Sequence, residues 1–457
     1  MPWVGGDTGR MGADGDDSVL RETEQEALVN LRIVLELCAA GQIRCGERTG
    51  RPSSATIRVL GEHLRDGDFY PHVPIASYAW PLLLQAGGLA KLGGARLELT
   101  PKGRAALRGS APEVVRGLWQ RWLTHAPIDE LSRIENIKGQ RSTNTLSAVK
   151  PRRQLVAQAL TRCCSVGEWV EIDTLFAKMQ RGNMSPTIAR NDRALWKLYL
   201  EDPQYGSLGY DGFHDWSLLE GRYTLAVIFE YAGTLGLVDL DYVDPAGARD
   251  DYRNNWGGDD LDALSRYDGL LAVRLNTLGA YAVGLTDTYV APVGIAAGPS
   301  VLKVLPNLDI VATGDLSSTD RLLMSAYATQ TADYTWTVSA KTLLTAVGVG
   351  RDLAEFVDFL AAHIDHDLPG TVTTLLQDVR RRAAQLTDLG YLRIIECQDP
   401  ALAAIIAGDR WLRTICRRIG DRHLAVAAEH EAKFRATLIS LGYVLTPGIL
   451  KSTHSPL

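Results

Sequence analysis

The chain has 457 residues, a formal net charge of −6 and a hydrophobic fraction of 46%, which indicates a globular protein of two or three domains. No uninterrupted apolar run reaches the roughly 18 residues that a membrane helix needs, so we expect no membrane partner and a cytoplasmic location. The negative net charge argues against a protein that coats nucleic acid indiscriminately. The six cysteines form no C-x2-C pair, which predicts free thiols rather than a zinc site.

The N-terminal part of the chain has the element order of a winged helix. Apolar residues at helical spacing and serine N-caps predict three helices, and two short strands around a Gly93-Gly94 turn predict a wing. We therefore predict a winged-helix-like module over 21–125, after a Gly- and Asp-rich tail (1–20) that we expect to be disordered. The expected elements are helices over 23–40, from Ser53 or Ser54 and over 74–87, strands over 88–92 and 95–100, and a further helix that Thr100 caps with Pro101 in its first turn.

The same order of elements returns later in the chain, which predicts an internal repeat. Setting ARLELTPKGRAALRG beside AVRLNTLGAYAVG shows a strand, a threonine, a glycine and a helix twice. We predict a second winged-helix-like module over 154–292, which differs from the first by an insertion over 183–221. Its expected elements are helices over 152–163, 172–180 and 222–235, the strands GLVDLDYV and LLAVRLN, and a closing helix.

Neither module has the third helix that a sequence-specific DNA reader needs, in which Arg, Lys, Asn or Gln contact base edges in the major groove. The first third helix has no basic residue between 74 and 87, and the second offers Arg222 near its start and then Glu230. The wing that follows the second is rich in aspartate, which would repel a phosphate backbone. Because both helices are apolar nearly all round, we expect them to pack against another domain or a partner.

The segment between the modules, 126–153, is predicted to be a basic linker. Its six Lys and Arg residues stand against Glu135 alone in SRIENIKGQRSTNTLSAVKPRRQ, and the interspersed Ser, Thr, Asn and Gln could also donate to phosphates. A solvated, flexible connector explains the composition equally well. The candidate nucleic-acid contacts of this linker are Arg133, Lys138, Arg141, Lys150, Arg152 and Arg153.

A second basic run and the aromatic insertion supply the remaining candidate residues. The run RWLRTICRRIGDRH (410–423) is predicted to be helical and adds Arg417 and Arg418 as candidate nucleic-acid contacts, although an exposed helical face is the simpler explanation. Buried aromatic side chains tend to anchor interfaces, so the insertion is a candidate partner-binding surface. Its candidate residues are Trp196, Tyr199, Tyr205, Tyr210, Phe213 and Trp216.

The sequence contains no catalytic or cofactor-binding motif that supports an enzyme. It has no G-x-x-x-x-G-K-[ST] phosphate loop, no G-x-S-x-G elbow and no H-E-x-x-H. His363 and His366 have no further ligands at a matching spacing, and turn formation explains the acidic, Gly- and Asn-rich loop 249–260. We therefore expect no catalytic residue, no metal and no cofactor, although a site scattered over several loops stays a third possibility.

From residue 301 on, the pattern changes to short strands alternating with helices. The predicted domain spans 296–450 and is followed by a short tail, 451–457. The expected elements are an extended run over 301–311, a helix over 316–331, the strand YTWTVS, a helix capped by Ser339, helices over 351–364 and 371–386, the strand GYLRIIEC, helices over 400–408 and 410–419, and a final helix and short strand ending near 448.

The segments VLPNLDIVATGDL, YTWTVSAKTLLTAVGVGRDLAEFVDFLAAH, DLPGTVTTLLQDVRRRAAQL and LISLGYVLTPG occur in an order that resembles the helicase-associated domain found beside XPB-type DNA helicases. The resemblance covers about 300–448. It implies a small α/β domain that contacts DNA and docks the motor, preceded by tandem winged-helix-like segments. The two motor domains of those helicases, with their phosphate loop and acidic box, have no counterpart here, so the resemblance does not extend to ATP hydrolysis.

These features together predict an α+β, predominantly helical protein with two winged-helix-like modules followed by a small α/β helicase-associated domain. The leading hypothesis is a non-enzymatic adaptor of a DNA-processing complex that binds a separately encoded helicase, ATPase or nuclease subunit, and DNA in addition. A setting in bacterial phage defence fits a motor-associated domain without a motor. The alternative is a winged-helix transcription regulator that binds DNA directly.

Overall fold

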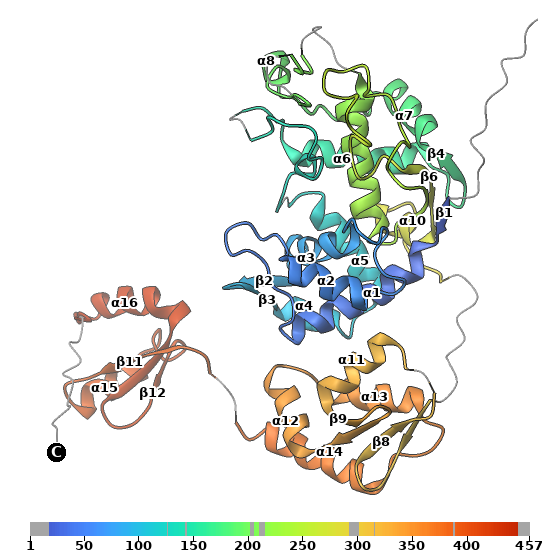
Figure 1. Cartoon of the computed structure of the whole chain (residues 1–457). Coiled ribbons are helices and arrows are strands. Elements are labelled where there is room, and N and C mark those ends of the chain that lie inside the picture. The colour runs from blue at the N-terminus through green and yellow to red at the C-terminus, as the bar shows by residue number, and fades with distance from the viewer. Residues whose placement is uncertain are drawn as a thin grey trace, which may run out of the picture. The chain divides into compact units, whose positions relative to one another are not determined.

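The computed structural model (Figure 1) describes residues 18–125, 127–141, 144–201, 205–209, 215–291, 301–314, 316–386 and 389–446. The protein is a mixed α/β structure with several small sheets, and it separates into two compact units, Met1–Val379 and Arg380–Leu457. No helix in the described part of the chain has both the length and the apolar character needed to cross a bilayer.

The first group of elements in the larger unit has the predicted order. The Ser53 side chain accepts a hydrogen bond from the Thr56 amide at 3.2 Å, and Thr100 caps its helix through the Gly103 amide at 3.1 Å. A short segment at 43–45 joins the β2–β3 hairpin as a third strand segment, since Leu97 N donates to Ile43 O at 3.0 Å. The elements are α1 (Thr23–Ala39), α2 (Ser54–His63), α3 (Ala76–Ala86), β2 (Ala90–Gly93), β3 (Arg96–Leu99), α4 (Pro101–Ala106) and α5 (Ala111–Trp122).

The second group repeats this order around a four-stranded sheet with the strand order β1-β5-β6-β4. Its third helix runs through η2, α9 and η3 without a break, and its two end stretches are wound as π-helix. The elements are α6 (Val149–Cys163), β4 (Trp169–Glu171), α7 (Ile172–Arg181), α8 (Asp192–Leu195), η2 (Ser217–Gly221), α9 (Arg222–Ala226), η3 (Val227–Gly233), β5 (Val238–Tyr242), β6 (Leu270–Leu275) and α10 (Thr277–Val283).

The N-terminal edge of this sheet differs from the sequence-based expectation. The segment predicted as a disordered tail (1–20) contributes its last two residues to β1 (Val19–Arg21), which pairs antiparallel with β5. The rest of the predicted tail, 1–17, lies outside the described residues. Arg21 holds the strand in place because its guanidinium pairs with Glu26 at 2.7 Å and donates to Gly67 O at 2.8 Å.

The two groups share a specific turn geometry where the third helix passes into the hairpin. Gly88 and Gly236 follow the third helices with φ of +69° and +72°, a conformation that favours glycine. After the hairpin, Thr100 N donates to Leu89 O at 2.9 Å, and Asn276 N donates to Leu237 O at 3.3 Å. The repeat seen in the sequence is therefore also a repeat in the backbone, with Asn276 rather than Thr277 in the position of Thr100.

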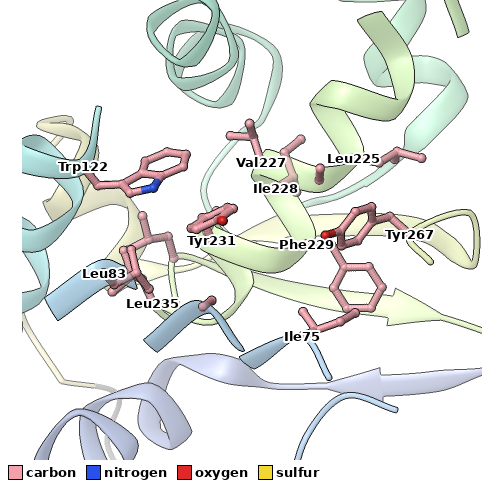
Figure 2. Close-up of a cluster of buried hydrophobic side chains, with 14 of the residues drawn as sticks. Ile75, Leu83, Trp122, Leu225, Val227, Ile228, Phe229, Tyr231, Leu235 and Tyr267 are labelled. Atoms are coloured by element: carbon pink, nitrogen blue, oxygen red, sulfur yellow. The ribbon is translucent and has the colours of Figure 1, made fainter. Parts of the chain in front are cut away.

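A single hydrophobic core joins both groups, and the two third helices lie at its centre (Figure 2). Leu83 of α3 lies in the same cluster as Tyr231 and Leu235, and the ring of Trp122 from α5 stacks on Tyr231 at 4.6 Å. Every residue from Leu218 to Leu240 is buried. The sequence predicted that these apolar helices pack against another domain or a partner; in the structure they lie together in one core within the larger unit.

Residues 301–379 form a second hydrophobic cluster around an antiparallel sheet with the order β7-β8-β10-β9. The predicted single extended run over 301–311 is instead a hairpin, which turns at Leu308 with φ of +71°. The predicted helix over 316–331 ends at Tyr327, because its last residues pair with β10. The elements are β7 (Leu302–Val304), β8 (Asp309–Ala312), α11 (Ser318–Tyr327), β9 (Ala328–Ala332), β10 (Thr335–Val338), α12 (Ala340–Gly348), α13 (Leu353–His363) and α14 (Gly370–Ala383).

Charged residues of α1 join this second cluster to the first core within the larger unit. Arg351 donates to Glu36 at 2.7 Å and to Glu355 at 3.2 Å, and all three side chains are buried. The guanidinium of Arg32 also forms an ion pair with the Glu355 carboxylate, with an N–O distance of 3.5 Å. Burial lowers the pKa of Arg351, but Glu36 and Glu355 outweigh that effect and raise it overall, so the guanidinium is charged at any physiological pH.

Ser339 caps helix α12 as predicted, and the structure shows a full capping box with Thr342. The Ser339 hydroxyl accepts from the Thr342 amide at 3.2 Å, and the Ser339 amide donates to Thr342 Oγ1 at 3.0 Å. We expect Ser339→Ala to destabilise α12 by about 1 kcal/mol, because the Thr342 amide loses its hydroxyl acceptor while the bond from the residue 339 amide to Thr342 Oγ1 remains. Hydrogen exchange of the α12 amides is the measurement, with Ser325→Ala, whose hydroxyl bonds only within α11, as the control. Unchanged exchange in Ser339→Ala would contradict the prediction.

The smaller unit has its own core and a three-stranded antiparallel sheet with the order β11-β13-β12. The segment predicted as one domain, 296–450, thus contains two hydrophobic clusters. The predicted helix over 410–419 is wrong, because Asp409 caps a turn through the amides of Trp411 and Leu412, and the chain then forms β12. No strand follows the last helix up to residue 446. The elements are β11 (Leu392–Glu396), α15 (Pro400–Gly408), β12 (Cys416–Arg418), β13 (His423–Ala427), η4 (Ala428–His430) and α16 (Glu431–Ser440).

Candidate functional site

The described parts of the predicted linker and of the predicted aromatic insertion pair with each other. Lys138 N donates to Tyr199 O at 2.8 Å, and Ser147 N donates to Ile188 O at 2.9 Å. Gly139 passes so close to Lys197 O that a Cβ atom there would lie 1.7 Å from it. The linker also contains the 3-10 helix η1 (Glu130–Arg133) and the start of α6. The flexible, solvated connector considered from the sequence is therefore not what this segment forms.

Arg153, a predicted nucleic-acid contact, is fully buried in the shared core. Its guanidinium donates to Glu130 at 2.8 Å and to His125 O at 2.9 Å, and it lies 3.9 Å over the ring of Trp122. Tyr223 donates to the second oxygen of Glu130 at 3.0 Å. Burial raises the pKa of Glu130, and Arg153 opposes that shift. This corrects the expectation for Arg153, because the side chain has no surface to present to a phosphate.

Arg133 and Arg152 are also buried and form ion pairs with carboxylates. Arg133 pairs with Glu230 at 2.9 Å and lies 3.6 Å over the ring of Tyr78. Arg152 is 1% exposed and pairs with Asp129. The composition of the linker is basic, but these arginines neutralise carboxylates inside the protein. The structure corrects the prediction of an exposed basic linker for both residues.

Lys138, Arg141 and Lys150 do lie on the surface. Lys138 and Arg141 line a groove of about 570 Å³ together with Arg51, whose guanidinium donates to Ser132 Oγ at 3.0 Å. The two acidic residues of the lining each hold an arginine, since Asp129 pairs with Arg152 and Glu135 pairs with Arg266 at 3.0 Å. The groove is consequently basic, and Arg51 is a residue that composition could not have assigned to it.

The aromatic residues of the insertion have separate environments. Trp196 and Tyr205 are exposed, and the Tyr205 ring lies 5.7 Å from that of Trp256, which is 64% exposed and lies outside the insertion. Tyr199 is half-buried where the linker pairs with the insertion. Trp216 packs edge-on against Phe176 and donates to Ser185 at 2.9 Å. The candidates Tyr210 and Phe213 lie outside the described residues.

Arg417 and Arg418 lie on the strand β12 of the smaller unit rather than on a helix. Both are exposed. Arg418 donates to the backbone oxygens of Gly420 and Asp421, each at 2.9 Å, and so supports the turn to β13. Arg417 lies on the opposite side of the strand, where Leu392, Ile394 and Ile419 are exposed as well. This aliphatic surface was missed, because the sequence shows which residues alternate on a strand but not which face a helix covers.

The described residues contain no group of three or more His, Cys, Asp or Glu side chains arranged to hold a metal ion. His363 and His366 each bind a backbone oxygen through Nδ1, that of Phe359 at 2.8 Å and that of Asp367 at 2.9 Å. In the acidic loop, Asp251 binds Arg222 at 2.6 Å. Comparison of the chain with protein-family models and with curated proteins gives no match.

Proposed function

We propose that the protein is a non-enzymatic adaptor of a DNA-processing complex, in which two fused winged-helix-like modules form a scaffold that docks a separately encoded helicase, ATPase or nuclease subunit. The observation that carries this proposal is the burial of both third helices in one shared core. A winged helix that reads DNA needs its third helix free to enter the major groove. Here α3 and the helix over 217–233 cover each other, which favours a rigid support over a DNA reader.

The element order supports the winged-helix assignment on which the proposal depends. Each group has a helix, a short strand segment, two further helices and a hairpin, and the short strand pairs with the second strand of the hairpin in both. Residues 43–45 bridge to β3, and β4 pairs with β6. The four-stranded sheet and helices of 301–379 supply the small α/β part that the helicase-associated resemblance implies. A setting in phage defence belongs to the same proposal.

DNA contact, within this proposal, falls to the surface residues Lys138 and Arg141 beside Arg51. A protein that neutralises Z phosphates shows a slope of log K against log salt of about −0.9Z on duplex DNA. We therefore expect weak, sequence-independent binding, and a slope that becomes shallower by about two in Lys138→Glu/Arg141→Glu. Filter retention of duplex DNA at several salt concentrations measures it. Arg181→Glu, an exposed reversal on α7, is the matched control and should leave the slope nearly unchanged.

The docking function is tested by purifying the tagged full chain from its native cell. Recovery of a stoichiometric ATPase or nuclease subunit is the expected result. Failure to recover such a subunit, together with tight binding of one defined DNA sequence selected from a random pool, would favour the transcription regulator instead.

A further inference from the structure

In the described residues of the smaller unit, one face of the sheet carries exposed side chains around the small, buried Ala425. Side chains alternate across each strand, and Ile395, Leu424 and Val426 are buried in one cluster with residues of α15 and α16. The other side of the same strands, which we term the open face, carries Ile394 at 64% exposure next to Ala425, with Arg417 on the far strand in the same row. The open face consists of Leu392, Ile394, Glu396, Arg417, Ile419, His423, Ala425 and Ala427.

The size of the open face limits what can occupy it. Three strands spaced about 4.8 Å apart, two of five residues and one of three at about 3.3 Å each, span roughly 200 Å². A stable dimer interface buries about 800 Å² on each partner. A second copy of the chain, packed face to face, would bury too little to hold. One α-helix, about 10 Å across with its side chains, covers most of such a surface, and the small area makes this a weak complex.

The charge of the smaller unit indicates whether the bound helix should be acidic or basic. Residues 389–446, which form its sheet and helices, contain 8 Lys and Arg against 6 Asp and Glu, whereas residues 1–379 contain 36 against 47. On the open face itself, Glu396 is paired with Arg422 at 3.1 Å, so Arg417 supplies the dominant charge. An occupant with carboxylates along one flank would be attracted to this unit and aligned by Arg417.

The chemistry of the open face argues against a single-stranded nucleic acid. Platforms that bind bases use aromatic side chains for stacking, whereas the open face is aliphatic. The exposed aromatics of the unit lie elsewhere. Tyr391 lies just before β11, Trp411 lies in the turn before β12 with Arg410 over its ring at 4.6 Å, and Tyr443 follows α16.

We propose that the open face binds one amphipathic helix of a partner protein, with aliphatic side chains against Leu392 and Ile394 and acidic side chains beside Arg417. This inference rests on the proposed function, since it names the surface and the partner chemistry of the docking step. Removal of aliphatic area from water supplies most of the affinity. The carboxylates add orientation and a dependence on ionic strength.

The experiment uses the full chain and three fluorescent probes. The first is a synthetic amphipathic peptide of about 18 residues, with leucines at helical spacing and glutamates elsewhere. The second has lysine in place of every glutamate, and the third is a single-stranded oligothymidine. Anisotropy titrations should show binding of the glutamate peptide, binding of the lysine peptide weaker by roughly tenfold, and loss of the difference at high salt.

Matched variants locate the binding surface. Leu392→Ser/Ile394→Ser should weaken the glutamate peptide by roughly tenfold or more, and Arg417→Glu should abolish the preference for glutamate over lysine. The control, Ile405→Ser/Ile439→Ser, replaces aliphatic residues of similar exposure on α15 and α16 and should bind as the parent does. Circular dichroism checks that each variant folds, which is expected because every replaced side chain is exposed.

Three results would overturn the inference: no binding of the glutamate peptide, an equal loss in the control variant, or oligothymidine binding that Leu392→Ser/Ile394→Ser removes. Co-purification separates this failure from that of the proposed function. If a helicase or nuclease subunit still co-purifies with Leu392→Ser/Ile394→Ser, the open face is not the docking surface but the adaptor function stands. If the parent chain recovers no such subunit yet binds the peptide, the adaptor function fails alone.

Discussion

Replacing Arg153 with methionine should lower the free energy of unfolding by about 3–5 kcal/mol, because it leaves the Glu130 carboxyl without its paired cation in the interior. Both side chains of the pair are 0% exposed, and the hydroxyl of Tyr223 remains as a hydrogen-bond donor to Glu130. The substitution also removes the cation–π contact with Trp122 and the hydrogen bond to His125 O. Urea denaturation followed by tryptophan fluorescence is the measurement, since Trp122 lies directly against the altered site.

The control for this prediction lies in the same segment of sequence. Arg141→Met removes an equal charge from an exposed position and should change stability by less than about 0.5 kcal/mol. The double variant Glu130→Leu/Arg153→Met should recover part of the loss, because replacing both partners removes the unpaired charge. If Arg153→Met leaves stability unchanged but weakens DNA binding more than Arg141→Met does, the residue acts as a surface contact and the buried assignment is wrong.

This contrast between Arg153 and Arg141 shows where sequence-based reasoning ends. Both arginines belong to one basic stretch, and no local signal separates them. The partner that buries Arg153 is Glu130, 23 residues earlier in the chain, and that of the neighbouring Arg133 is Glu230, 97 residues away. Burial depends on that long-range packing, so composition predicted a basic surface where much of the charge is internal. The half-buried Arg51 lines the groove for the same reason, since its place there also depends on long-range packing.

Local signals, in contrast, predicted local structure well. Ser53, Thr100 and Ser339 each begin the helix expected of them, because an N-cap hydroxyl acts on amides two or three residues away. The helix predicted over 410–419 is wrong because residues 416–418 form β12 by pairing with β13, and this tertiary pairing overrides helix propensity. The open face could not be predicted either, since the helices α15 and α16 decide which side of the sheet is covered.

Alanine at Gly103 and at Gly279 should destabilise the protein by similar amounts, about 1–3 kcal/mol each. Both glycines are buried at the start of the helix after the hairpin. A Cβ atom would lie 2.0 Å from Leu89 O in the first case and 1.9 Å from Leu237 O in the second. Each carbonyl already accepts a backbone hydrogen bond, Leu89 O from the Thr100 amide and Leu237 O from the Asn276 amide. The helix must therefore move away from that strand, and the bond must lengthen with it.

Gly117 in α5 separates this close approach from helix propensity. A Cβ atom at Gly117 meets nothing within 4 Å, so Gly117→Ala should stabilise the protein by about 0.5–1 kcal/mol. Chemical denaturation of the three single variants measures all three effects. Helix propensity alone favours alanine at every one of these positions, so losses at Gly103 and Gly279 must come from contact with the carbonyl. A loss at Gly103 with none at Gly279 would mean that the two modules share an order of elements but not the same packing.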